Sequence, residues 1–187
     1  MNYLESAKRQ FRLYKQLGEK AMEQASPDQL FFQPNEETNS IAIIVQHLWG
    51  NMMSRWTDFM TTDGEKEWRK RDAEFESILN SKEELSQQWN AGWDCLFAAL
   101  DSIGDNQLDE IIYIRNEGHT VLEAINRQIA HYSYHVGQIV LLAKMFSNQN
   151  WNSLSIPRNK SAQYNAGKFG EEKGKRHFTD EWLKDDK

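Results

Sequence analysis

The chain has 187 residues, of which 39% are hydrophobic and 27% are charged, so it suits one globular domain and is neither disordered nor fibrous. Its net charge of −6, without a basic stripe, argues against binding of DNA or RNA. No apolar run approaches the roughly 20 residues of a membrane span, and the first residues lack an apolar signal region. We therefore expect a soluble cytoplasmic protein.

The first part of the chain predicts two helices. Apolar residues at steps of three and four mark one from Asn2 to Gln24. A break at residues 26–28 and a connection rich in Pro and Asn follow it. A second apolar pattern runs from Ser40 toward Phe59, with Asn39 or Ser40 as its N-cap, and residues 61–64 then suit a turn.

Two capping boxes indicate where two further helices begin. The box at residues 81–84 opens a third helix that ends by Gly104. The box at residues 120–123 opens a fourth helix that runs to about Phe146. Between these helices, residues 111–118 alternate apolar and polar positions and are expected to be extended or to form a small hairpin.

Four long helices with short connections predict an all-α fold, an up-and-down four-helix bundle over residues 1–150. Residues 151–187 have few periodic apolar positions and are expected to form a long C-terminal loop or tail, packed on the bundle up to about residue 165. The charge run from Glu65 to Glu76 is expected to be a solvated or ion-paired surface, and His177 in the tail is expected to be solvated.

Three histidines form the candidate site. His131 and His135 stand four residues apart on the fourth helix, so their side chains share one face and can converge on one metal ion. His47 lies inside the second helix, which can neighbour the fourth, and Gly50 would permit a close approach there. The same pattern also suits a helix–helix contact with three inert, hydrogen-bonded histidines, and the residues alone leave both interpretations open.

A family resemblance bears on this choice. The segments IVQHLWGN around His47 and HYSYHVGQI at residues 131–139 resemble the DinB/YfiT-like superfamily of bacterial proteins. Residues 54–76 and 153–165 are similar to a branch of that superfamily described as a domain of unknown function. The resemblance implies a four-helix bundle in which the helix-two histidine and the helix-four pair hold one divalent ion. Nickel, zinc, iron and manganese are the candidates, and imidazole ligands alone do not choose among metals.

The resemblance also implies a function. Characterised members of the superfamily include thiol S-transferases that use low-molecular-weight thiols such as bacillithiol, and three histidine ligands leave a coordination position open for such a thiol. A metal-dependent thiol transferase or related detoxifying enzyme is therefore the leading hypothesis. The alternative is a non-catalytic, metal-stabilised homodimer that serves as an interaction module. A homodimer is expected in either case, because many relatives form dimers.

No motif fixes a catalytic acid or base, so the catalytic residues stay unassigned. Gln138, Tyr134 and Arg158 are candidates to support the metal ligands or to contact a substrate, although packing or solvation is the simpler role for each. Cys95 is the single cysteine, which excludes an internal disulfide, and a buried, inert thiol is expected there. His119 precedes the fourth helix and is expected to be a loop residue rather than a fourth ligand.

Overall fold

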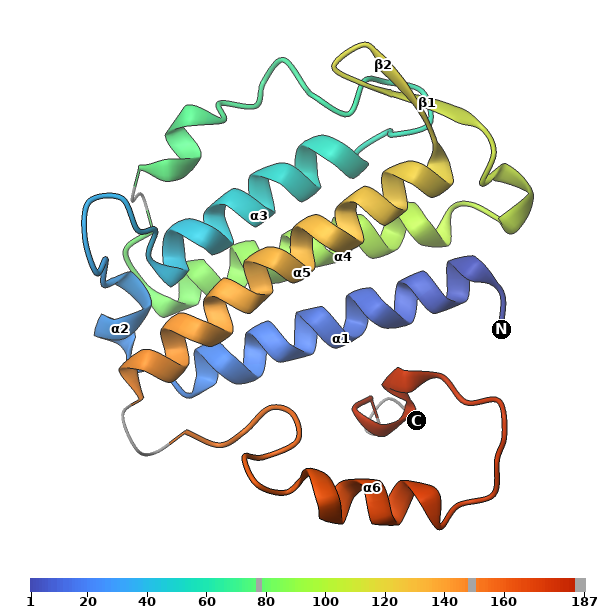
Figure 1. Ribbon diagram of the computed structural model, residues 1–187. Helices are drawn as coiled ribbons and strands as arrows, with labels where there is room; N and C mark the ends of the chain where they lie inside the picture. Colours follow the sequence, from blue (N-terminus) through green and yellow to red (C-terminus); the bar gives the residue numbers. More distant parts are fainter. Residues whose placement is uncertain (77–78, 148–150, 184–187) are drawn as a thin grey trace.

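The computed structural model describes residues 1–76, 79–147 and 151–183, and this part of the chain is mostly helical (Figure 1). The four long helices are α1 (Tyr3–Glu23), α3 (Ile41–Trp56), α4 (Lys82–Asp101) and α5 (Val121–Phe146). The shorter elements are α2 (Pro27–Phe31), α6 (Ser161–Phe169) and the 3₁₀ turns η1 (Asp72–Phe75), η2 (Asp105–Gln107) and η3 (Phe178–Glu181). The strands β1 (Ile111–Ile114) and β2 (Glu117–Thr120) form one antiparallel hairpin.

Each long helix begins at a polar N-cap, which explains why the starts were predictable from sequence. Each cap side chain accepts a hydrogen bond from the backbone N–H of the residue three positions later. The acceptor and donor pairs are Asn2 and Glu5, Ser40 and Ile43, Ser81 and Glu84, and Thr120 and Glu123. The box at Thr120 is complete, because the Glu123 carboxylate accepts the Thr120 N–H at 2.8 Å. At the start of α4 the Glu84 carboxylate instead accepts the N–H of Asn80, at 2.9 Å.

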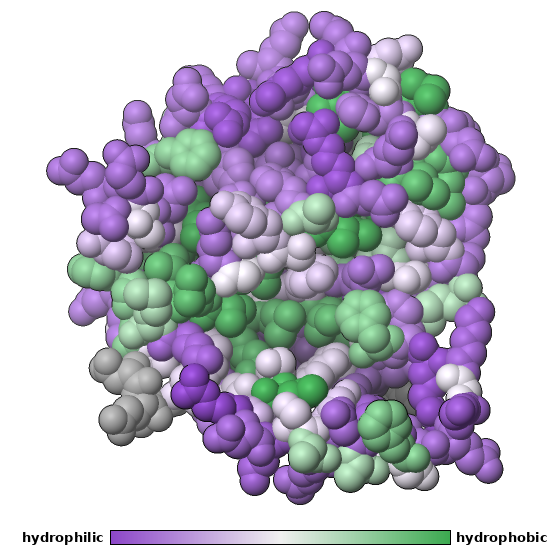
Figure 2. Space-filling view, in the orientation of Figure 1, coloured by the Kyte–Doolittle hydropathy of each residue, from purple (hydrophilic) through white to green (hydrophobic). Residues whose placement is uncertain are grey.

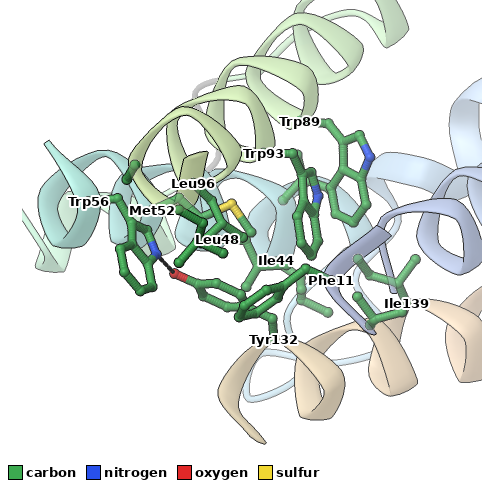
Figure 3. Close-up of a cluster of buried hydrophobic side chains, with 14 of the residues drawn as sticks. Phe11, Ile44, Leu48, Met52, Trp56, Trp89, Trp93, Leu96, Tyr132 and Ile139 are labelled. Carbon is green, nitrogen blue, oxygen red and sulfur yellow. Dashed lines mark hydrogen bonds between the residues drawn. The ribbon is translucent and has the colours of Figure 1, made fainter. Parts of the chain in front are cut away.

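The core lies between the four long helices and is rich in aromatic rings (Figure 3). Phe11 of α1, Trp93 of α4 and Tyr132 of α5 meet there with ring centroids 5.8 to 6.4 Å apart. The Tyr132 hydroxyl accepts the indole N–H of Trp56 and donates to Asn51, each at 3.0 Å. Because both partners lie on α3, this pair of bonds fixes the register of α5 against α3, one residue away from His131.

Helix α3 is the most enclosed of the four, since α4 and α5 pack on two sides of it and residues 57–76 of the connection to α4 pass over it (Figure 1). That connection is held down by Gln46, whose side-chain amide lies 2.9 to 3.0 Å from the carbonyl oxygens of Ala73, Glu74 and Glu76. A buried amide with three backbone acceptors places η1 directly over the middle of α3.

The hairpin closes one end of the helices. Its turn uses positive φ angles at Arg115 and Asn116, which suit a tight two-residue loop. The Asp63 carboxylate accepts both backbone N–H groups of that turn, at 2.9 and 2.8 Å, and the Gly64 N–H donates to the Tyr113 carbonyl at 2.8 Å. The turn predicted at residues 61–64 is therefore tied to the hairpin. A hairpin was one of the two structures predicted for residues 111–118, and the other was a single extended segment.

The tail contains structure that the sequence did not predict. Residues 161–169 form the exposed helix α6, although they were expected to be loop. Near the start of the tail, Gln24 exchanges hydrogen bonds with the backbone of Asn152, at 2.7 and 3.2 Å. The expected domain boundary after residue 150 falls beside residues 148–150, which lie outside the described residues, as do the last residues, 184–187.

The end of the described tail docks on α1. Thr179 is fully buried, and its hydroxyl accepts a hydrogen bond from Arg9 at 3.1 Å, while Arg9 also pairs with Asp180. His177 is half-buried and its Nε2 lies 2.9 Å from the Ser6 hydroxyl. The expectation of a solvated His177 is therefore wrong, because short-range polar contacts with α1 enclose it despite its charged surroundings in sequence.

The surface is mixed in character (Figure 2). Hydrophobic side chains gather in a band across the middle of the face shown, over the region where α5 and α1 run side by side, and hydrophilic side chains surround it. On α5, Leu141 and Met145 are largely exposed. Among the described residues, no helix combines the length and the apolar character needed to cross a membrane.

Candidate metal centre

The structure brings together the three histidines that the sequence singled out. His47 comes from α3, and His131 and His135 come from α5, with one ring nitrogen of each lying within 4.8 Å of the others. The Nε2 atom of His131 is 3.4 Å from Nε2 of His47 and 3.1 Å from Nε2 of His135. The four-residue spacing on α5 aligns one pair, and the Tyr132 contacts with α3 bring the third histidine opposite them.

The other ring nitrogen of each histidine faces an oxygen acceptor. The Nδ1 contacts are His47 to Glu74 Oε2 at 2.8 Å, His131 to Gln128 Oε1 at 3.3 Å and His135 to Gln138 Oε1 at 2.8 Å. Because a carboxylate or amide oxygen only accepts, these contacts place the proton on Nδ1 and leave a lone pair on Nε2. All three Nε2 lone pairs therefore face one centre, the orientation found in histidine metal sites.

Glu74 is a supporting residue that the sequence did not single out. It lies in the charge run expected to be a solvated or ion-paired surface; it is ion-paired, as the second interpretation had it, but it is buried rather than at the surface, with only 7% of its area exposed. Its carboxylate accepts from His47 and also from Nε and Nη2 of Arg69, at 2.7 and 2.9 Å. Burial would raise the pKa of Glu74, but the hydrogen bonds from His47 and Arg69 outweigh burial and hold the pKa below its usual range.

Glycine at position 50 makes room for this carboxylate. A Cβ atom at Gly50 would lie 2.8 Å from the Cδ atom of Glu74, closer than real side-chain contacts allow. Gly50 follows His47 by one helical turn, so the gap it leaves lies beside that histidine. The close approach expected from Gly50 thus exists, but the connection over α3 uses it, rather than a neighbouring helix.

The two histidines of α5 are neutral over a wide pH range. Burial, followed by the repulsion from His135, lowers the pKa of His131 to about 3. Burial, followed by the repulsion from His47, lowers the pKa of His135 to about 4. A histidine must be neutral to bind a metal ion. Both side chains are already neutral at pH 7, so each offers a lone pair without first losing a proton.

A cavity of about 430 Å³ lies beside the histidines and is lined by all three of them. The Phe75 ring stacks on the His47 imidazole, with ring centroids 5.1 Å apart and planes inclined by 28°. The Tyr134 ring meets His135 edge-on at 5.0 Å and is 62% exposed. The centre that the Nε2 atoms face is therefore open to a recess that has the volume of a small-molecule site.

The remaining candidate residues lie in different places. Gln138 bonds His135 and Tyr134 lines the cavity. Arg158 is exposed in the tail and does not line the cavity. Cys95 is half-buried on α4, 3.7 Å from the Thr57 hydroxyl, and burial raises its pKa, so the thiol is protonated at neutral pH. His119 lies in β2 rather than in a loop, outside the histidine cluster.

Together these features define a class, a mostly helical protein in which three histidines from two long helices could hold one metal ion beside an open recess. A family model described as "Protein of unknown function (DUF1572)" matches residues 1–160, and the chain belongs to that family. The match includes the three histidines and their supporting residues. No curated protein and no solved structure matches the chain.

Proposed function

We propose that the protein binds one divalent metal ion through the Nε2 atoms of His47, His131 and His135, within an up-and-down four-helix bundle of the DinB/YfiT-like type. The observation that carries this proposal is the convergence of three lone pairs whose opposite nitrogens are all tied to acceptors. Nitrogens bound to a tetrahedral zinc at about 2.05 Å lie about 3.3 Å apart. The two Nε2 separations of 3.4 and 3.1 Å bracket that value.

The first test is metal content. Wild type purified with zinc, nickel, iron or manganese present is expected to retain about one ion per chain after dialysis, measured by inductively coupled plasma mass spectrometry. His47→Ala should lose the ion, whereas His119→Ala should retain it, because His119 lies outside the cluster. Equal metal content in wild type and His47→Ala would overturn the proposal.

We further propose that the ion serves a metal-dependent thiol S-transferase, as the superfamily resemblance suggests. A bound ion would hold a small thiol as its thiolate, a strong nucleophile at neutral pH. The chain supports this chemistry with neutral histidine ligands and a recess that admits a small molecule to the ion. The thiolate would attack an electrophile, displacing its leaving group, while the thiol proton passes to solvent.

The alternative, a non-catalytic metal-stabilised homodimer, is favoured by one observation. Leu141 and Met145 are 58% and 60% exposed on the outer face of α5, where two apolar side chains one turn apart suit contact with a second copy. In this alternative the ion stabilises the fold and no thiol reaches it.

One pair of measurements separates the two proposals. A cobalt-substituted protein should develop a thiolate-to-metal charge-transfer band when a small thiol is added if the ion serves transfer. Size-exclusion chromatography with light scattering should show a dimer that dissociates when chelator is added, and after Leu141→Glu, if the ion serves assembly. A thiol band together with an oligomer that chelator leaves unchanged would favour the transferase.

A further inference from the structure

We infer that the recess beside the three histidines is a binding site for a small molecule with at least two negative charges, held by arginine side chains. The further step, that this anion is the substrate presented to the metal ion, rests on the proposed function. The anion site itself does not, because it is argued from a different set of residues.

Arginine dominates the lining of the recess. Five arginines line it, and the described lining residues include no aspartate or glutamate; the five are Arg55, Arg69, Arg71, Arg115 and Arg127. They come from α3, α5, the hairpin turn and the connection over α3, so separate parts of the fold converge on one cationic cavity. In a chain of net charge −6, such a local reversal of sign concentrates small anions at this place.

Only part of this positive charge is neutralised by the protein. Arg69 is committed to Glu74 and also lies 3.3 Å from Glu65, which is itself 3.3 Å from the exposed Arg115. Arg71 lies over the Phe75 ring at 5.5 Å, a contact that leaves its charge available. Among the described residues, no carboxylate forms an ion pair with Arg55, Arg71 or Arg127. Three unpaired cations around one recess call for more than one negative charge.

Arg55 gives the strongest indication. It is only 5% exposed, and its Nε and Nη1 atoms have no hydrogen-bond partner among the described residues. A buried guanidinium without an ion-pair partner is costly, and such groups are rare in native proteins. Burial and the repulsion from Arg127 outweigh the attraction of Tyr132 and Glu65 and lower the pKa of Arg55 below its ordinary value. Nε and Nη1 are enclosed by protein, but the side chain lines the recess, so an oxyanion bound there would compensate this charge electrostatically.

The positions of the arginines also relate the anion to the metal ligands. Arg127 precedes His131 by one turn of α5, so the two side chains share a helix face. Arg55 follows His47 by two turns of α3, and both line the recess. An anion held between Arg55 and Arg127 would therefore lie along the same wall as the Nε2 atoms. A reactive group a few bonds away on that molecule could reach the ion.

The anion site is tested by calorimetric titration of the full-length protein, both metal-free and zinc-loaded, with succinate, inorganic phosphate and, as an uncharged control, glycerol. We expect saturable one-to-one binding of at least one dianion, weakened by added salt, and no binding of glycerol. The better of succinate and phosphate identifies carboxylate or phosphate as the preferred group. If neither dianion binds saturably, the inference is wrong.

Substitutions assign the binding to the recess. Arg55→Gln and Arg127→Gln should each weaken dianion binding about tenfold, the usual effect of losing a charge-assisted hydrogen bond. Arg127 is exposed, so this variant folds even if Arg55→Gln does not. Arg12→Gln is the matched control, an exposed arginine of α1 outside the lining, and should leave affinity within twofold. Equal losses in Arg12→Gln and Arg127→Gln would overturn the assignment.

The link to the metal site has its own measurement. Mercaptosuccinate should perturb the cobalt spectrum at about tenfold lower concentration than uncharged thioglycerol, and Arg127→Gln should remove this advantage. Equal potency of the two thiols would refute the link. If neither thiol reaches the ion but His47→Ala still binds succinate, the thiol function fails while the anion site stands.

Discussion

Replacing Glu74 by Gln should weaken metal binding without changing any metal ligand. The carboxylate holds Nδ1 of His47 at 2.8 Å and is in turn held by two nitrogens of Arg69. A carboxylate partner raises the basicity of a ligand imidazole and fixes its orientation. The amide of glutamine keeps the shape but loses the charge, so the lone pair on His47 Nε2 becomes a weaker donor to the ion.

The sizes of the expected losses in metal affinity and in stability follow from the position of Glu74 between two buried side chains, His47 and Arg69. Loss of such a supporting partner typically lowers metal affinity by about 10- to 100-fold. The same substitution leaves the Arg69 side chain, 3% exposed, with only Glu65 at 3.3 Å as a counter-charge. Breaking a fully buried pair costs about 3–5 kcal/mol, and the remaining contact with Glu65 reduces this to an expected loss of about 2 kcal/mol in unfolding free energy.

Both quantities are measured on the same protein samples. Zinc affinity is obtained by calorimetry against a competing chelator, and stability by urea unfolding of the metal-free protein. Glu76→Gln is the matched control, an exposed residue of the same connection, and should change neither quantity. A zinc affinity within threefold of wild type in Glu74→Gln would refute the supporting role, even if stability fell.

Three further predictions concern neighbouring features. Gly50→Ala should displace the Glu74 carboxylate and lower zinc affinity in calorimetry. Gly137→Ala, which has nothing within 4 Å of the added Cβ, should raise the free energy of unfolding by about 1 kcal/mol through helix propensity alone. The metal-free protein should lose about 2 kcal/mol of unfolding free energy between pH 7.5 and pH 5. The reason is that His131 and His135 bind protons near pH 6.5 in the unfolded chain but only near pH 3 and pH 4 in the folded protein. The figure of about 2 kcal/mol is half the value for two fully shielded histidines, because both side chains are partly exposed. A pH slope in urea unfolding that survives removal of both histidines would contradict this assignment. Arg9→Ala should release the end of the tail from α1 with little change in melting temperature. Limited trypsin digestion would detect the release as faster cleavage after Lys175. Unchanged cleavage would contradict the docking.

The parts of the fold that sequence predicted are those with local causes. Helix starts follow from caps that bond within their own first turn, as at Ser40 and Thr120. The pairing of His131 with His135 follows from helical spacing alone. The convergence of His47 on that pair depends on the packing of α3 against α5. The residues alone left it as one of two interpretations, and the family resemblance favoured it. The helix starts and the His131–His135 pair could be predicted because few distant residues decide them.

The parts that sequence missed depend on distant partners. Glu74 lies in a charged stretch whose composition is typical of solvated surface, and its burial depends on Gln46, 28 positions earlier. The tail docks through Thr179 on Arg9, 170 positions away, with no apolar period to indicate it. Gly50 carried a partial signal, since a glycine one turn from a candidate ligand indicates that something approaches closely. It did not indicate which segment approaches.

The connection of residues 57–80 is thus as important to the site as the helices. Connections of this length without long secondary structure are uncommon in compact domains unless they serve function. This one supplies the carboxylate behind His47, the Phe75 ring stacked on it and two arginines of the recess. The three candidate ligands lie on rigid helices, where their geometry is fixed by core packing. Charge and shape around them are set largely by the connection, so substitutions there could alter which anion enters while the three histidines keep their positions.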